Sequence, residues 1–193
     1  MIAHINGKLV EKTPTYVVIE CNGVGYQLNI SLNTFSKLSN DENCKLFSQF
    51  VVREDAQLLY GFINESEKRL FQLLVSVSGI GPSTAMMVLS SGDAEEIRDA
   101  ILSGDVAWFN SVKGIGPKSA QRIIIDLKDK IAKENIGSEN ISRIDNTIKD
   151  EALSALVMLG FNRSQAEKTI TKILKSNSEF GVEDLIKHAL KAR

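Results

Sequence analysis

The chain has 193 residues, of which 43% are apolar and 24% are charged, and its formal net charge at pH 7 is −1. This length and composition predict one to three small globular domains, and no apolar stretch of about 18 residues predicts a membrane span. Basic and acidic residues are mixed along the whole sequence, which excludes a polybasic arm. Any binding to a polyanion must therefore come from a local arrangement of groups.

Residues 1–63 are predicted to form strands. β-Branched and aromatic residues gather in five short runs, and a polar or helical insert at residues 33–38 precedes the fourth run. This pattern fits a five-stranded, closed barrel of OB type better than a sandwich. Cys21 and Cys44 lack metal-binding spacing, so we expect reduced, packed strand residues in a cytoplasmic protein. The runs are residues 2–10, 16–19, 24–30, 45–52 and 57–60.

Residues 64–134 change to the apolar period of helices, and about five helices are expected in a separate domain. Asn64 and Glu67 have the spacing of a capping box at the start of the first of them. Asp93 and Asp105 are expected to begin two others, because aspartate is a favoured N-cap residue.

Two phrases in this helical region are near copies of each other, 35 residues apart: Ser78-Gly-Ile-Gly-Pro-Ser83 and Lys113-Gly-Ile-Gly-Pro-Lys118. Glycine permits a tight turn, and proline is suited to the start of the next helix. A helix-hairpin-helix turn of this kind points a helix N-terminus at solvent, which favours an anion. Two such turns predict a surface that holds successive phosphates of a nucleic-acid backbone. A pair of plain interhelical turns is the alternative.

The residues expected to bind DNA lie in these two turns and just after them. Lys118 brings a charge to the second hairpin, whereas Ser83 can only donate a hydrogen bond at the matching position of the first. Lys128 and Lys130 fit a solvated helix face equally well. The full set is Gly79, Gly81, Ser83, Lys113, Gly114, Gly116, Lys118 and Arg122.

Residues 135–147 are polar and lack both periods, so they are predicted to form a flexible linker. Residues 148–193 then read as a small bundle of three helices, with Ser164 and Glu167 spaced as a second capping box. The Met158-Leu-Gly-Phe161 turn resembles the loop of ubiquitin-associated-type bundles. Because so small a bundle buries only a thin core, we expect it to present an apolar face to a partner. The candidates are Leu159, Ile170, Leu174, Leu185 and Ile186.

This order of parts resembles the RuvA family, the Holliday-junction-binding subunits of the bacterial branch-migration complex. The most specific match is residues 50–62, Phe-Val-Val-Arg-Glu-Asp-Ala-Gln-Leu-Leu-Tyr-Gly-Phe, and the resemblance covers the whole chain. It implies a homotetramer, or an octamer on DNA, that holds a four-way junction open in recombination and DNA repair. It also implies two partners, the hexameric ATPase RuvB, bound by residues 148–193, and the resolvase RuvC. Ser83 departs from the family, whose members often have lysine there.

Glu54 and Asp55 stand side by side between two predicted strands and fit a simple hairpin turn. In the family the corresponding pair forms an acidic pin at the centre of the junction face. Two carboxylates repel phosphates at short range, and salt screens this repulsion. The resemblance therefore implies that the pair keeps continuous duplex away from that centre.

Two other function classes compete with this interpretation. A helix-hairpin-helix glycosylase would require a larger helical body, and no catalytic motif, nucleotide-binding loop, metal site or cofactor site is recognisable in the sequence. A generic adaptor could instead bind single strands on its barrel, but few basic residues fall in the first 63. We therefore expect a non-catalytic DNA-binding subunit.

Overall fold

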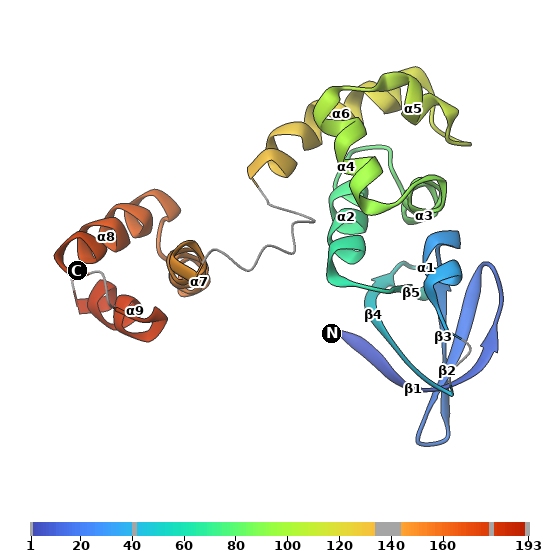
Figure 1. Ribbon diagram of the computed structural model, residues 1–193, viewed down its shortest axis with the longest axis horizontal. Coiled ribbons are helices and arrows are strands. Elements are labelled where there is room, and N and C mark those ends of the chain that lie inside the picture. Colours follow the sequence, from blue (N-terminus) through green and yellow to red (C-terminus); the bar gives the residue numbers. More distant parts are fainter. Residues whose placement is uncertain (1, 40–41, 134–143, 178–179, 192–193) are drawn as a thin grey trace. The chain divides into compact units, whose positions relative to one another are not determined.

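The N-terminal strands close into a small barrel (Figure 1), in a computed structural model that describes residues 2–39, 42–133, 144–177 and 180–191. The strand order around the barrel is β1-β2-β3-β5-β4. All neighbouring strands are antiparallel except β3 and β5, and β4 closes the barrel on β1. The predicted OB-type barrel is confirmed. Its strands are β1 (His4–Lys12), β2 (Tyr16–Cys21), β3 (Val24–Ile30), β4 (Asn43–Val52) and β5 (Gln57–Phe62).

The barrel has its own apolar core, because alternate residues along each strand point inward. Val17, Leu28 and Leu46 have no exposed surface in this core. Both cysteines are free thiols, as predicted, and burial raises the pKa of Cys44. The predicted insert is a short helix, α1 (Leu32–Lys37), between β3 and β4.

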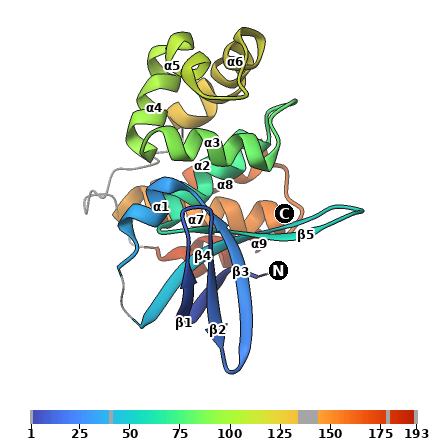
Figure 2. The ribbon, with the colours of Figure 1, turned by 90° about the vertical axis from the view of Figure 1, so that its right-hand side faces the viewer.

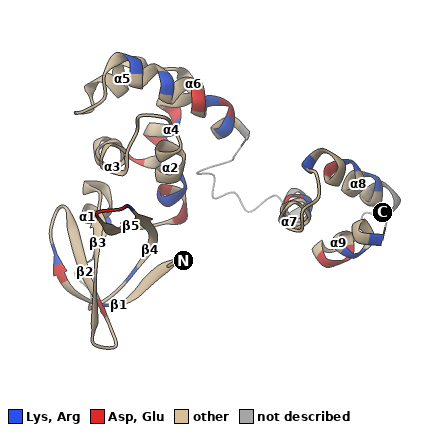
Figure 3. Cartoon of the chain, turned by 180° about the vertical axis from the view of Figure 1, so that it is seen from behind, with Lys and Arg blue, Asp and Glu red and all other residues tan. Residues whose placement is uncertain are grey.

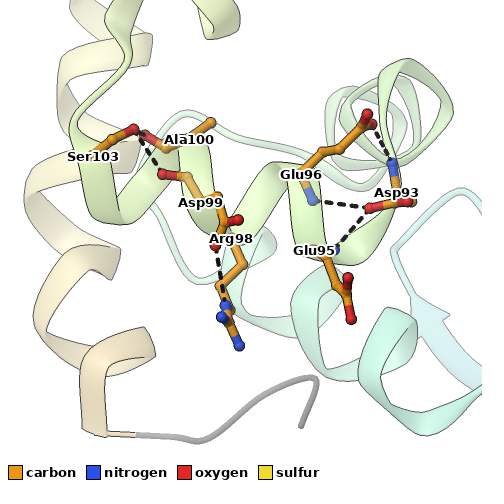
Figure 4. Close-up of polar contacts among 7 residues, drawn as sticks. All are labelled: Asp93, Glu95, Glu96, Arg98, Asp99, Ala100 and Ser103. Atoms are coloured by element: carbon orange, nitrogen blue, oxygen red, sulfur yellow. Dashed lines mark hydrogen bonds and ion pairs between the residues drawn. The ribbon is translucent and has the colours of Figure 1, made fainter.

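Five helices follow the barrel, in agreement with the prediction. They are α2 (Glu65–Val75), α3 (Pro82–Ser91), α4 (Ala94–Ser103), α5 (Val106–Ser111) and α6 (Pro117–Lys133). The reciprocal capping box lies at α4, where the Asp93 side chain accepts from the Glu96 backbone and the Glu96 side chain accepts from the Asp93 backbone (Figure 4). Asn64 caps α2, but the Glu67 side chain does not complete the predicted box there; it accepts bonds from other elements.

The barrel and these helices belong to one compact unit, Met1–Ser138. The reason is a shared apolar cluster. Tyr60 and Phe62 of β5 pack on Phe71 of α2, with ring centroids 5.1 and 5.0 Å apart, and join the core of the helices.

The second unit, Glu139–Arg193, contains the three predicted helices: α7 (Ile144–Met158), α8 (Arg163–Ser176) and α9 (Val182–Lys191). The linker prediction is wrong for residues 144–147, which belong to α7, and residues 135–143 lie outside the described residues. The second predicted capping box is also wrong. Asn162 caps α8, and its side chain accepts a hydrogen bond from the Ser164 backbone N–H.

Candidate nucleic-acid interface

The two predicted hairpins are the same turn, bond for bond. In the first, between α2 and α3, the Ile80 N–H donates to the Val77 carbonyl at 3.0 Å. In the second, between α5 and α6, the Ile115 N–H donates to the Val112 carbonyl at 3.1 Å. Each isoleucine is buried, so it anchors its turn to the core. The helix-hairpin-helix prediction is therefore confirmed in its geometry at both sites.

The two positions of each hairpin are occupied by glycine for different physical reasons. Gly79 and Gly114 have φ of 88° and 90°, a left-handed backbone that side chains disfavour. The second glycine needs no such conformation. A Cβ built on Gly116 meets nothing within 4 Å, so nothing inside the chain requires glycine there. The open space instead lets an external group approach the backbone.

The N-termini of α3 and α6 complete the two turns. Pro82 and Pro117 are the first helical residues, and the first bonds of the helices run from Ala85 to Gly81 and from Ala120 to Gly116, each 2.9 Å. The backbone N–H groups that precede Ala85 and Ala120 in the first turn of each helix have no acceptor within their own helix. They supply partial positive charge for an anion.

The side chains beside these N–H groups differ between the hairpins. Lys113 and Lys118 are exposed at the second. At the first, Ser83 hydrogen-bonds to Tyr60 of the barrel. Burial raises the pKa of Tyr60 above its usual value, and the Arg53 charge and the Ser83 bond offset only part of that rise. Arg53 Nη2 also lies 4.0 Å from the position of a Cβ on Gly81. The approach of a barrel residue to the first hairpin was not predicted from the sequence.

Arg122 joins the two hairpins, a role that its sequence position did not suggest. Its Nη1 donates to the Ser78 carbonyl of the first hairpin at 3.1 Å, although the side chain comes from the helix of the second. The start of α6 therefore lies against the first hairpin, and Arg122 is exposed there. Two anion sites linked in this way suit a ligand with regularly spaced phosphates.

Glu54 and Asp55 form the tip of the β4–β5 hairpin. Val52 pairs with Gln57, and the Arg53 N–H donates to the Ala56 carbonyl at 2.8 Å, so the two acids are the central residues of a tight turn. Both are exposed. The hairpin extends away from the other strands in Figure 2, and its tip is the red segment near β5 in Figure 3.

The candidate partner surface of the second unit needs a correction. Ile170 and Leu185 have no exposed surface and belong to the core of the bundle, so their predicted place on an exposed apolar face is wrong. Leu174 and Ile186 are half-buried against the same core, and Leu159 is 60% exposed. Beside Leu159, the end of α7 exposes Val157 and also Met158, which is 89% exposed. We call residues 157–159 the α7 patch.

Metal-binding clusters and membrane-spanning helices are both absent from the part of the chain that the structure describes. No group of three or more His, Cys, Asp or Glu side chains among those residues could hold a metal ion. No helix in the same part is both long and apolar enough to cross a membrane.

A closed OB-type barrel joined to paired hairpins of this geometry defines a tandem helix-hairpin-helix protein. Family models agree with each part. The RuvA N terminal domain matches residues 1–61, the SAM-like helix-hairpin-helix tandem matches residues 71–129, and the RuvA C-terminal domain matches residues 147–192.

Curated relatives extend this agreement over the whole chain. Proteins named Holliday junction branch migration complex subunit RuvA are 54% identical in Christiangramia forsetii, 54% in Flavobacterium psychrophilum and 48% in Cytophaga hutchinsonii. Each alignment covers 99% of this chain and 99% of the relative. The chain belongs to the RuvA family.

Proposed function

We propose that this chain binds four-way junction DNA as the non-catalytic subunit of a branch-migration complex, with the two hairpins holding backbone phosphates. The observation that carries this proposal is the duplicated turn. Two anion sites have the same hydrogen bonds, Arg122 links the helix of the second to the first, and the open space at Gly116 gives a phosphate access to the backbone. The names of the relatives indicate that the DNA structure is a Holliday junction.

The proposed DNA contacts are the eight residues predicted from the sequence. Gly79, Gly81, Gly114 and Gly116 offer backbone N–H groups, and Lys113 and Lys118 offer charge. Ser83 offers a hydroxyl that can donate to a phosphate, and Arg122 offers guanidinium N–H groups beyond the one that bonds to Ser78. These contacts read the phosphates rather than the base edges, so they select DNA shape and not sequence.

The proposed assembly is a homotetramer, or an octamer on DNA, that operates in the cytoplasm. A fourfold arrangement would repeat the Glu54-Asp55 turn around the centre of the junction and concentrate its negative charge there. The motor would be RuvB, a hexameric ATPase, and RuvC would act on the same junction. We assign the motor contact to the α7 patch, because it is the exposed apolar end of a helix in a unit with its own core.

Replacing Lys118 by alanine should weaken junction binding and make it less dependent on salt. A lysine that neutralises one phosphate releases a counterion, and each such lysine contributes about −0.9 to the slope of log K against log salt. The slope of the Lys118→Ala variant, measured by titrations at several salt concentrations, should therefore be shallower by about 0.9 for each phosphate that Lys118 neutralises.

Lys128→Ala is the matched control, because Lys128 is an exposed lysine on the same helix α6 but lies beyond the hairpin. Equal changes in slope for Lys118→Ala and Lys128→Ala would contradict a specific phosphate contact at the second hairpin.

Replacing Glu54 by glutamine and Asp55 by asparagine should reduce selectivity rather than affinity. The change removes the repulsion of phosphates while nearly keeping the shape of the turn. Binding to plain duplex should strengthen more than binding to the junction, and the rate of branch migration with the motor should change. Competition between labelled junction and unlabelled duplex measures the ratio of the two affinities. If both affinities shift equally and migration is unaffected, the pair is an ordinary surface turn.

A further inference from the structure

Glu67 is a buried carboxylate that the DNA contacts do not use. Its side chain is only 4% exposed, in the first turn of α2. It accepts hydrogen bonds from the Ser31 and Thr34 hydroxyls, each at 2.7 Å, and from the Ile63 N–H at 3.2 Å. Burying a charged group costs free energy unless it is well paired, so three donors at one carboxylate mark a specific arrangement.

These three donors tie together separate elements. Ile63 directly follows β5, Ser31 is the N-cap of α1, and Thr34 lies within α1. One side chain of α2 therefore holds both the end of the barrel and the insert helix. Ser31 and Thr34 have no exposed surface, so water does not compete for these bonds.

The insert helix in turn holds the helix of the first hairpin. The Leu32 N–H donates to Ser90 Oγ at 3.1 Å, and Asn33 Nδ2 donates to the Gly92 carbonyl at 3.0 Å. Both acceptors lie at the C-terminal end of α3, and the first hairpin is at its other end. Figure 1 shows α1 between the barrel and α3.

The acidic turn lies at the other end of this series of bonded elements. β5 begins just after Glu54 and Asp55 and ends beside Ile63, which Glu67 holds. Glu67 thus connects the acidic turn to the first hairpin by two routes, through β5, α1 and α3 to the far end of α3, and along α2 itself, while Arg53 approaches Gly81 directly. The apolar packing of Phe71 on Tyr60 and Phe62 holds the same joint independently, so removal of the polar bonds should loosen it without unfolding it.

We propose that Glu67 is a positioning residue that fixes the acidic turn relative to the first hairpin, and thereby sets the preference for a junction over duplex DNA. This inference rests on the proposed function. Selectivity requires that the repelling carboxylates stand at a set distance from the sites that attract phosphates. A loosened joint would let the acidic turn move aside when continuous duplex binds.

The test compares Glu67→Gln with Glu65→Gln, an exposed carboxylate in the same first turn of α2. Glutamine cannot accept all three bonds, because its amide nitrogen is a donor. Glu67→Gln should lower the ratio of duplex to junction Kd by about two- to thirtyfold, the range for residues that couple sites without touching the ligand. The salt slope on duplex should stay unchanged, and Glu65→Gln should behave as the unaltered chain.

The same substitution in a chain that already has Glu54→Gln and Asp55→Asn separates positioning from simple stability. If Glu67 acts through the acidic turn, Glu67→Gln should add no further reduction of selectivity in that background. A proportional decrease of both affinities, or an equal change of the ratio in both backgrounds, would overturn the inference. Should Glu67→Gln fail to fold, Thr34→Val removes one of the three bonds instead, and its effects are judged by the same criteria.

The outcome also distinguishes this inference from the proposed function. An unaltered chain that binds junction and duplex equally would overturn both. A clear junction preference that Glu67→Gln and Thr34→Val leave intact would overturn the positioning role alone.

Discussion

A chain that ends at Ser138 should still bind junction DNA but should fail to stimulate the motor ATPase. Residue 138 is the last of the first compact unit, which contains both hairpins and the acidic turn. The second unit has an apolar core of its own, and the core clusters of the two units share no residue. Junction affinity should change by less than about threefold, while branch migration with RuvB should fall to the rate of RuvB alone. Mobility shifts and a migration assay on the same preparation measure the two activities.

Met158→Asp in the full-length chain tests the proposed motor contact more narrowly. The side chain is 89% exposed, so a charge there should cost the bundle little stability but should disturb an apolar contact. Leu190→Asp, at an exposed apolar position on α9, is the control.

Normal migration by the truncated chain, or failure of that chain to bind the junction, would contradict the proposed division of labour.

Gly116→Val should weaken junction binding much more than it lowers stability. A Cβ at this position meets nothing within 4 Å, so the chain leaves room for the start of a side chain, and the expected loss of stability is the small cost of valine before a helix. The valine side chain would occupy the space through which a phosphate reaches the backbone. Removing one charge-assisted hydrogen bond costs about 1.5–3 kcal/mol, which is roughly 10- to 150-fold in affinity for each site. Thermal unfolding and junction titration measure the two quantities.

Gly181→Val is the matched control for this prediction. Gly181 also precedes a helix, and its carbonyl accepts the first hydrogen bond of that helix from the Leu185 N–H. No atom lies within 4 Å of the position of a Cβ on Gly181. Gly181→Val should lower stability by a similar small amount and leave DNA binding unchanged. Gly114→Val is less informative, because the left-handed backbone there strains any side chain. Unchanged junction affinity in Gly116→Val would mean that the second hairpin is only a turn.

The sequence predicted those features that depend on residues close together along the chain. The strands appear as short apolar runs, and the two hairpins appear in the repeated Gly-Ile-Gly-Pro phrase, whose turn is closed by hydrogen bonds between neighbouring residues. The hairpin tip at Glu54 and Asp55 could be found for the same reason. The order of these parts was enough to indicate the family.

The features that sequence reasoning missed depend on contacts between distant residues. Glu67 has the spacing of a capping residue, but its partner Ser31 lies 36 positions away. Arg122 bonds to Ser78, 44 positions away. In the second unit, the helical period identifies an apolar face but not how much of it the other helices cover. Ile170 and Leu185 are therefore buried, whereas Met158 is exposed because α7 ends at that residue.

The most direct test of the central claim is a comparison of three DNA ligands at one salt concentration. A four-way junction, a duplex and a single strand, built from the same sequences, would be titrated with the full-length chain in a mobility-shift assay. The paired hairpins and the acidic turn predict the tightest binding to the junction, with little change when the sequence of its arms is altered. Equal binding to junction and duplex, or preference for the single strand as expected of a barrel that stacks bases, would contradict the proposed function.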